Sequence, residues 1–252
     1  MEGQRHGHLG ARSEQDGHAG LLRAWYKAAM AGLYAILDWP HAGGLDVAAA
    51  ARGLLGARPE GPGPRYLQLR CKGADTSTRI ALIEQVAPIC LAAGVPLIIN
   101  DDLDAARARP SLVGGVHLGQ HDLQRLGPPS AWRERLVALR AAGDLIVGVS
   151  THDLDQVRAS AALPVDYIGF GPVQATRSKA QPDPVVGFEG LAAACAGALH
   201  PVVAIGGLDA AGAVRAAEAG AAMVAVIGAL VAASPAEIQR RVVALARALA
   251  AY

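Results

Sequence analysis

The sequence predicts a single α/β domain built as a (β/α)8 barrel. Apolar, β-branched runs with the length of strands begin at Leu33, Tyr66, Pro96, Gly115, Leu145, Val165, Val202 and Met223. Ala-rich segments with helical spacing separate most of these runs, as expected for strands that alternate with helices around a parallel sheet. The chain has 252 residues, and such a barrel typically needs about 250. An open, doubly wound sheet is the second choice, because no G-x-G-x-x-G turn follows the first run.

Two helices can be placed from their apolar spacing. The i, i+3, i+4, i+7 pattern of one helix face joins Ile83, Val86, Ala87 and Cys90, and it joins Ala210, Ala213, Val214 and Ala217 in a later segment. Pro88 lies inside the first pattern and predicts a kink, because proline removes a helical hydrogen bond.

The last helix is recognised by its start. Ser234 is suited to capping, Pro235 to the first helical position, and Glu237 completes a capping box. The apolar stripe that follows consists of Ile238, Val242, Leu245 and Leu249.

The remaining segments set the domain organisation. Residues 1–20 are polar and rich in Gly and His, so we expect a flexible tail there. The barrel domain is expected over residues 21–252, with an extra helix over 21–30 before its first strand. Gly56–Pro64 predicts a loop, and the long segment Pro172–Gly187 after the sixth strand predicts a lid over the ligand face.

Charge and composition narrow the partners to small-molecule substrates. The net charge of +1 provides no basic field for nucleic acid or for an anionic membrane. The longest apolar stretch, Ala219–Ala233, is too short to span a bilayer, and residues 1–19 lack a signal-peptide pattern. Cys71, Cys90 and Cys195 have neither metal-ligand nor disulfide spacing. A cytoplasmic protein is predicted, and whether it forms a homo-oligomer stays open.

Polar groups follow the apolar runs. They are Gln68–Lys72, Asn100–Asp102, His117–Asp122, Gly148–His152, Thr176–Lys179 and Ala204–Gly207. In parallel α/β folds the C-terminal ends of the strands form the ligand-binding face. Carboxylates, cations, amides and a glycine pair on that face predict metal-assisted phosphate chemistry.

Asp101 and Asp122 are the candidate metal ligands. They follow the third and fourth strands, which are neighbours in a barrel, and Mg²⁺ takes few protein ligands beside water and phosphate oxygens. Helix capping is the other interpretation of Asp122. Asp102 and Asp104 are better explained as capping or surface groups.

Basic side chains provide candidate phosphate contacts. Arg70 and Lys72 alternate along the end of the second strand, so both can face the barrel mouth while Cys71 points toward the helices. Arginine offers a planar fork to phosphate and lysine a point charge. Lys179, on the predicted lid, is positioned in the sequence to close over a bound anion.

Neutral polar residues complete the predicted site. Gln68 and Asn100 suit a heteroaromatic ring or a phosphate, or else satisfy backbone groups at the strand ends. Ser150 can cap the next helix while touching a phosphate. His152 is either a general base or a group that orients the turn.

Glycines follow the last two strands. Gly206 and Gly207 end the seventh strand, and Gly228 ends the eighth. Glycine at this barrel position lets a phosphate approach backbone N–H groups beside a helix N-terminus. A second phosphate site is therefore predicted here.

The ordered motifs resemble the thiamine phosphate synthase family. They are Q-x-R-x-K, N-D-D, H-x-G-Q-x-D, G-V-S-x-H, G-P-x-x-x-T-x-S-K and A-I-G-G, spread between Leu33 and Ala233. The resemblance implies a barrel transferase that joins hydroxymethylpyrimidine diphosphate to thiazole phosphate with Mg²⁺ and releases diphosphate. Such a dissociative reaction needs positioning and charge stabilisation, not a protein nucleophile.

The resemblance also implies a role for each motif residue. The pyrimidine diphosphate would be held by Gln68, Arg70, Lys72, Asn100, Ser150 and Lys179. Of these, the catalytic residues would be Arg70, Lys72, Ser150 and Lys179. Mg²⁺ would bind Asp101 and Asp122. The thiazole phosphate would lie beside Thr176, Ser178, Gly207, Ile227 and Gly228.

Three positions depart from the family pattern, and two other functions stay open. Cys71 stands where Glu is usual, His121 where an acidic residue is common, and Gly228 where Ser is usual. The alternatives are a thiazole tautomerase-like isomerase that uses His152 and a non-catalytic regulator that binds a thiamine-related ligand. The carboxylate pair and the lysines favour the synthase.

Overall fold

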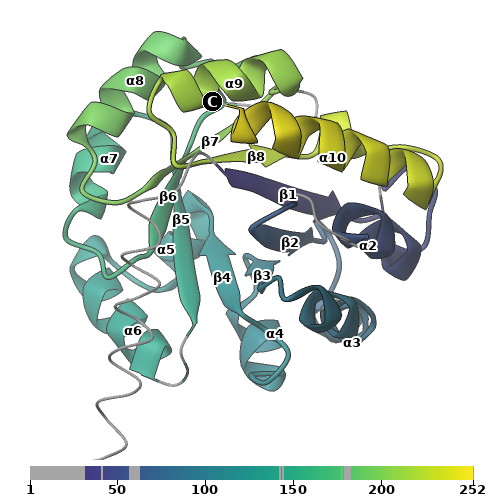
Figure 1. Ribbon diagram of the computed structural model, residues 1–252. Helices are drawn as coiled ribbons and strands as arrows, with labels where there is room; N and C mark the ends of the chain where they lie inside the picture. Colours follow the sequence, from purple (N-terminus) through teal and green to yellow (C-terminus); the bar gives the residue numbers. More distant parts are fainter. Residues whose placement is uncertain are drawn as a thin grey trace, which may run out of the picture. The chain divides into compact units, whose positions relative to one another are not determined.

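The predicted (β/α)8 barrel is confirmed. The computed structural model describes residues 32–40, 42–56, 63–141, 143, 145–176, 178 and 183–251. Their strands form a closed barrel in the order β1 to β8, and the helices lie outside it (Figure 1). The expected tail over residues 1–20 and the extra helix over 21–30 lie outside the described residues, as does Lys179.

All strand pairs are parallel, and β8 pairs with β1 to close the barrel. The strands are β1 (Gly32–Asp38), β2 (Tyr66–Arg70), β3 (Leu97–Asn100), β4 (Gly115–Leu118), β5 (Ile146–Thr151), β6 (Tyr167–Phe170), β7 (Val202–Ile205) and β8 (Met223–Val226). Each begins close to the position that its apolar run predicts.

A helix follows each strand. The helices are α2 (Val47–Leu55), α3 (Thr76–Ala93), α4 (Leu103–Ala108), α5 (Gln120–Arg125), α6 (Pro129–Ala141), α7 (Leu154–Ser160), α8 (Gly187–Gly197), α9 (Ala210–Glu218), the short 3₁₀ helix η1 (Gly228–Leu230) and α10 (Pro235–Ala250). The start of α10 and its buried stripe are confirmed, since Ser234 Oγ accepts from Glu237 N at 3.3 Å, but the Glu237 carboxylate accepts from Arg240 and Arg241 instead of completing the capping box.

The other two predicted helices agree with the structure only in part. The apolar face of α3 is buried as expected and the helix continues through Pro88, where the kink stays a prediction. In α9, Ala213 and Ala217 are buried, whereas Ala210 is exposed. Ala210 directly follows the cap, Asp209, and so begins the first turn at the exposed end of the helix.

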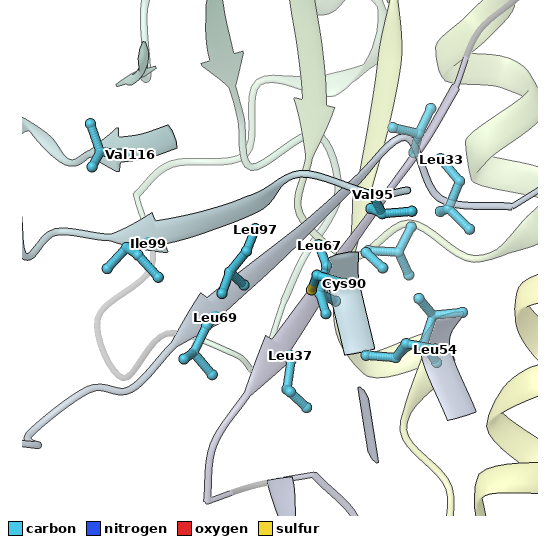
Figure 2. Close-up of a cluster of buried hydrophobic side chains, with 14 of the residues drawn as sticks. Leu33, Leu37, Leu54, Leu67, Leu69, Cys90, Val95, Leu97, Ile99 and Val116 are labelled. Carbon is cyan, nitrogen blue, oxygen red and sulfur yellow. The ribbon is translucent and has the colours of Figure 1, made fainter. Parts of the chain in front are cut away.

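Alternating side chains on each strand separate two packing regions. On β1, Leu33, Ala35 and Leu37 belong to the apolar cluster shared with the helices. The corresponding residues of β2 and β3, with Leu54 and Cys90 from α2 and α3, continue the same cluster in Figure 2. Because successive strand side chains point to opposite faces, the residues between them point into the barrel.

The inward series carries the polar groups. It includes Tyr34 and Gln68 near the middle of β1 and β2, and Asp38 and Arg70 at their ends. The alternation therefore brings polar side chains to the C-terminal mouth of the barrel. Among the described residues, none of the helices has the length and apolar content needed to cross a bilayer.

Candidate active site

A cavity of about 820 Å³ opens at the C-terminal ends of the strands. The sequence-predicted site residues that line it are Gln68, Arg70, Lys72, Asn100, Asp101, Asp122, Ser150, Thr176, Ser178, Gly207, Ile227 and Gly228. The structure thus brings together the predicted residues that it describes. Lys179 lies outside the described residues, so its position beside the cavity stays a prediction.

The two candidate metal ligands lie side by side. Asp101 directly follows β3 and Asp122 lies in the first turn of α5, and each carboxyl shifts the pKa of the other. The backbone N of Gly119 donates to Asp101 Oδ1 at 3.2 Å. Asp101 has a φ of 66°, which is uncommon for a residue with a side chain. Capping of α4 falls to the next residue, Asp102, as predicted.

The pKa values of the two carboxyls are shifted in opposite directions. Burial and the nearby Asp101 charge raise the pKa of Asp122 to about 6. Burial also acts to raise the pKa of Asp101, but the hydrogen bond and positive charge of Lys72 outweigh it and lower that pKa. Two like charges in one site favour a shared proton, and a cation would relieve the same repulsion.

The basic residues are held by carboxylates. Lys72 Nζ pairs with Asp101 Oδ2, and Arg70 Nη1 pairs with Asp38 Oδ1. Arg70 Nη2 also donates to the backbone oxygen of Ser178 at 3.3 Å, which ties β2 to the loop after β6. Cys71 points the other way and is buried in the apolar cluster, as predicted.

The glycine turn after β7 approaches the loop after β6 closely. Gly206 and Gly207 have φ values of 105° and 68°, which glycine adopts without a steric penalty. A Cβ on Gly207 would lie 2.3 Å from the oxygen of Ala175, so this residue must be glycine for the two loops to meet. A Cβ on Gly228 would have no atom within 4 Å. A side chain at Gly207 would therefore clash with the backbone of the loop after β6.

A hydrogen-bonded chain of side chains crosses the barrel interior, which the sequence did not predict. Gln68 Nε2 donates to Tyr34 Oη at 2.8 Å, and the Tyr34 and Tyr167 hydroxyls are 2.8 Å apart. Tyr167 Oη lies 3.0 Å from His117 Nδ1, and His117 Nε2 lies 3.0 Å from Ser150 Oγ. We call these five residues the cross-barrel chain. In the sequence, the alternation of these residues with apolar neighbours was the signal that they face the barrel interior.

His152 joins β5 to the loop after β6. Its Nδ1 lies 2.8 Å from the oxygen of Gly171 and 3.6 Å from Asp183 Oδ2. Because a carbonyl oxygen only accepts, Nδ1 is the donor of the shorter contact. The expected role in orienting the turn is supported by this geometry.

These features define a class of protein. A (β/α)8 barrel whose mouth collects paired carboxylates, cations, amides and a glycine turn has the groups that a phosphate-handling enzyme uses. The family model described as thiamine monophosphate synthase matches residues 33–230. The chain belongs to this family.

Individual relatives agree with the family match. The thiamine-phosphate synthase of Anaeromyxobacter dehalogenans is 36% identical over 217 residues, which cover 86% of this chain and 87% of that protein. The thiamine-phosphate synthase of a Synechococcus species is 39% identical over 168 residues, which cover 67% of this chain but only 44% of that protein.

A solved structure has the same fold. Thiamine phosphate pyrophosphorylase from Pyrococcus furiosus superposes with a TM-score of 0.69 at 24% identity. The match covers 86% of this chain and 95% of that one. At this identity the likeness supports the barrel fold alone.

Proposed function

We propose that this chain is a transferase that makes thiamine phosphate from hydroxymethylpyrimidine diphosphate and thiazole phosphate, releasing diphosphate. The proposal is supported by one cavity that two groups of residues suited to anions line at different strand ends. Asp101, Asp122, Arg70 and Lys72 gather at the ends of β2 to β4, and the Gly207 turn lies after β7. Family membership supports the same reaction.

The first region suits a diphosphate with Mg²⁺. Within the described residues no cluster of three or more His, Cys, Asp or Glu side chains forms a metal cage. Two neighbouring carboxylates match the small number of protein ligands that Mg²⁺ takes when substrate oxygens complete its shell. Asp101 and Asp122 would hold the ion, which when bound supplies positive charge to the leaving diphosphate.

The second region suits the phosphate of the thiazole. Gly207 and Gly228 line the cavity after β7 and β8, where barrels often bind phosphate through backbone N–H groups. Thr176, Ser178 and Ile227 also line the cavity. Barrel order separates this region from the carboxylates of β3 and β4, so the substrates would meet between the two regions.

The reaction requires the protein to stabilise the charge on the leaving group and to position the two substrates. The bond between the pyrimidine methylene carbon and the diphosphate oxygen breaks, and its electron pair leaves with diphosphate. Arg70, Lys72 and the proposed lid residue Lys179 offset the charge that develops on this leaving group. The thiazole nitrogen then donates its electron pair to the methylene carbon. Gln68, Asn100 and Ser150 would hold the pyrimidine so that the two reacting atoms lie in line.

The direct test combines the purified protein with both substrates and follows thiamine phosphate by chromatography. Product is expected only when both substrates and Mg²⁺ are present, with one diphosphate released for each thiamine phosphate. Isomerisation of the thiazole phosphate without the pyrimidine would support the tautomerase alternative. Binding without turnover at saturating Mg²⁺ would support the regulator and contradict the proposal.

A further inference from the structure

One fixed donor sets the proton positions along the cross-barrel chain. The side-chain nitrogen of Gln68 can only donate, so Tyr34 Oη accepts from it. Tyr34 is 1% exposed, and among the described residues its hydroxyl contacts one other polar group, Tyr167 Oη. The Tyr34 proton must therefore go to Tyr167, because the opposite order would leave a buried hydroxyl without an acceptor.

The same logic fixes the histidine. Tyr167 Oη already accepts from Tyr34, so its own proton is directed to His117 Nδ1. A histidine ring that accepts a hydrogen bond at Nδ1 is neutral and has a single N–H. With Nδ1 accepting, that proton lies on Nε2 and is donated to Ser150 Oγ. The Ser150 hydroxyl keeps its own proton for a group in the cavity.

The two ends of the cross-barrel chain therefore offer different hydrogen-bonding groups. Gln68 and Ser150 both line the cavity. The Gln68 amide nitrogen is occupied by Tyr34, and its Oε1 makes no hydrogen bond with the described residues, so this end offers an acceptor. Ser150 offers a donor. A ligand that lies between β2 and β5 must present the opposite pattern.

We propose that Tyr34, Tyr167 and His117 are positioning residues that fix Gln68 as an acceptor and Ser150 as a donor toward the pyrimidine diphosphate. The inference rests on the proposed function, in which both ends contact this substrate. An exocyclic amine on the pyrimidine supplies the donor that Gln68 Oε1 needs. A ring nitrogen or a phosphate oxygen supplies the acceptor that Ser150 needs.

These proton positions also exclude a role for Ser150 as a nucleophile that His117 activates. A nucleophilic serine requires a neighbouring base that can take its proton. His117 Nε2 already has a proton, which it donates to Ser150. Ser150 therefore acts as a hydrogen-bond donor and not as an activated nucleophile.

The first test reads the histidine tautomer without any substrate. Nitrogen-15 NMR of the whole protein, labelled at its histidines, distinguishes protonated from bare ring nitrogens, and His117→Gln assigns the signal. A proton on Nε2 is expected in the native protein, with a mixture of both tautomers in Tyr167→Phe. A native proton on Nδ1 would overturn the proposal. This result stands even if the protein makes no thiamine phosphate.

The second test measures substrate use with a matched control. Tyr66 packs 5.4 Å from the Tyr34 ring and 6.1 Å from the Tyr167 ring, but its hydroxyl is not one of the groups of the cross-barrel chain. Tyr167→Phe should raise the KM for the pyrimidine diphosphate about three- to tenfold, as expected for one lost neutral hydrogen bond. The KM for thiazole phosphate should stay unchanged.

The control separates positioning from packing. Tyr66→Phe should leave both KM values and the His117 tautomer unchanged, and thermal unfolding of both variants reports whether the barrel stays folded. Equal effects of the two substitutions on the pyrimidine KM would contradict the proposal. So would a Tyr167→Phe variant that is folded and keeps both the native tautomer and the native KM.

Discussion

At the scale of single residues, aspartates at neighbouring positions differ in pKa and in role because their surroundings differ. Asp101 and Asp122 share one site, yet Lys72 lowers the pKa of the first while burial and the Asp101 charge raise that of the second. Asp102, next in the chain, caps α4 and binds Arg79 instead. The sequence predicted the capping role of Asp102 beside the candidate metal ligand Asp101, but not the different pKa shifts of Asp101 and Asp122.

The partners of these residues were harder to predict. Asp38, Tyr34 and Tyr167 alternate with apolar residues along their strands, which indicates that they share the inward face but not which groups they contact. The pairing of β1 with β2 brings Asp38 to Arg70, and the packing of inward side chains from β4 and β6 brings Tyr167 to His117. Sequence patterns identify which residues face inward, but the contacts across the barrel depend on tilt and register.

Asp122→Asn should make the metal-free protein more stable at neutral pH. The folded pKa of about 6 lies above the unfolded value, which is about 3.9. The proton is therefore bound more tightly in the folded state, and stability is lost as the pH rises through 6. These pKa values correspond to about 3 kcal/mol as an upper bound, and because solvent screens this partly exposed carboxyl the substitution should add about 1 kcal/mol to the free energy of unfolding at pH 7.5.

Urea denaturation in a chelating buffer measures that gain. It should shrink as the pH falls and disappear below about pH 4, where the carboxyl is neutral in both states. A stability difference that does not vary between pH 4 and 7.5 would contradict the assigned pKa.

Two glycines at the proposed thiazole phosphate region should respond differently. Gly207→Val places a side chain against the Ala175 oxygen at a φ of 68°, so it should lower the thermal midpoint and raise the KM for thiazole phosphate. Gly228→Ser enters open space and should be tolerated, with binding tightened by at most about 0.5–1.5 kcal/mol for one hydrogen bond. Comparable losses in both variants would argue against this arrangement of the region.

At the scale of elements, aspartate caps place the helices after the strands. The caps of α2, α3, α4, α7 and α9 are Asp46, Asp75, Asp102, Asp153 and Asp209. Each accepts from a backbone N–H three residues later, which satisfies a group left open at a helix start. The sequence allowed the capping interpretation of Asp102, and the spacing from Ile83 to Cys90 predicted a helix across Pro88, which α3 forms because packing offsets the local cost of the proline.

Asp102→Ala should destabilise the protein strongly. Its carboxylate accepts from Ala105 N at 2.8 Å, Arg79 Nη1 at 2.7 Å and Thr76 Oγ1 at 3.0 Å. Loss of the cap and of a partly buried ion pair should cost about 2–4 kcal/mol in the free energy of unfolding. Denaturant unfolding measures the effect.

Asp104→Ala is the matched control, because this side chain is 85% exposed and lies in the same helix. It should change the stability by at most about 0.5 kcal/mol. Although burial acts against ionisation, the bonds from Ala105 and Arg79 lower the pKa of Asp102. The contribution of Asp102 to the free energy of unfolding should therefore be present at neutral pH and be lost in acid. Similar effects of the two substitutions would refute the capping account.

At the scale of the whole molecule, barrel closure turns separate sequence motifs into one site. Polar groups spread from Gln68 to Gly228 line a single cavity because all strands are parallel and their C-terminal ends share one face. The fold was predictable because apolar runs and helical spacing repeat along the chain. The distances within the site were not, because they depend on pairings such as Asn100 with His117.

The measurement that tests the central claim most directly is the Mg²⁺-dependent rate of thiamine phosphate formation by the native protein, Asp122→Asn and Asp104→Asn. The native protein and Asp104→Asn should form product at similar rates. Asp122→Asn should lose at least about tenfold in rate, since one charged ligand to the cation is removed. It should also need more Mg²⁺ for half its maximal rate. Native-like rate and Mg²⁺ dependence in Asp122→Asn, or no product from the native protein, would contradict the account.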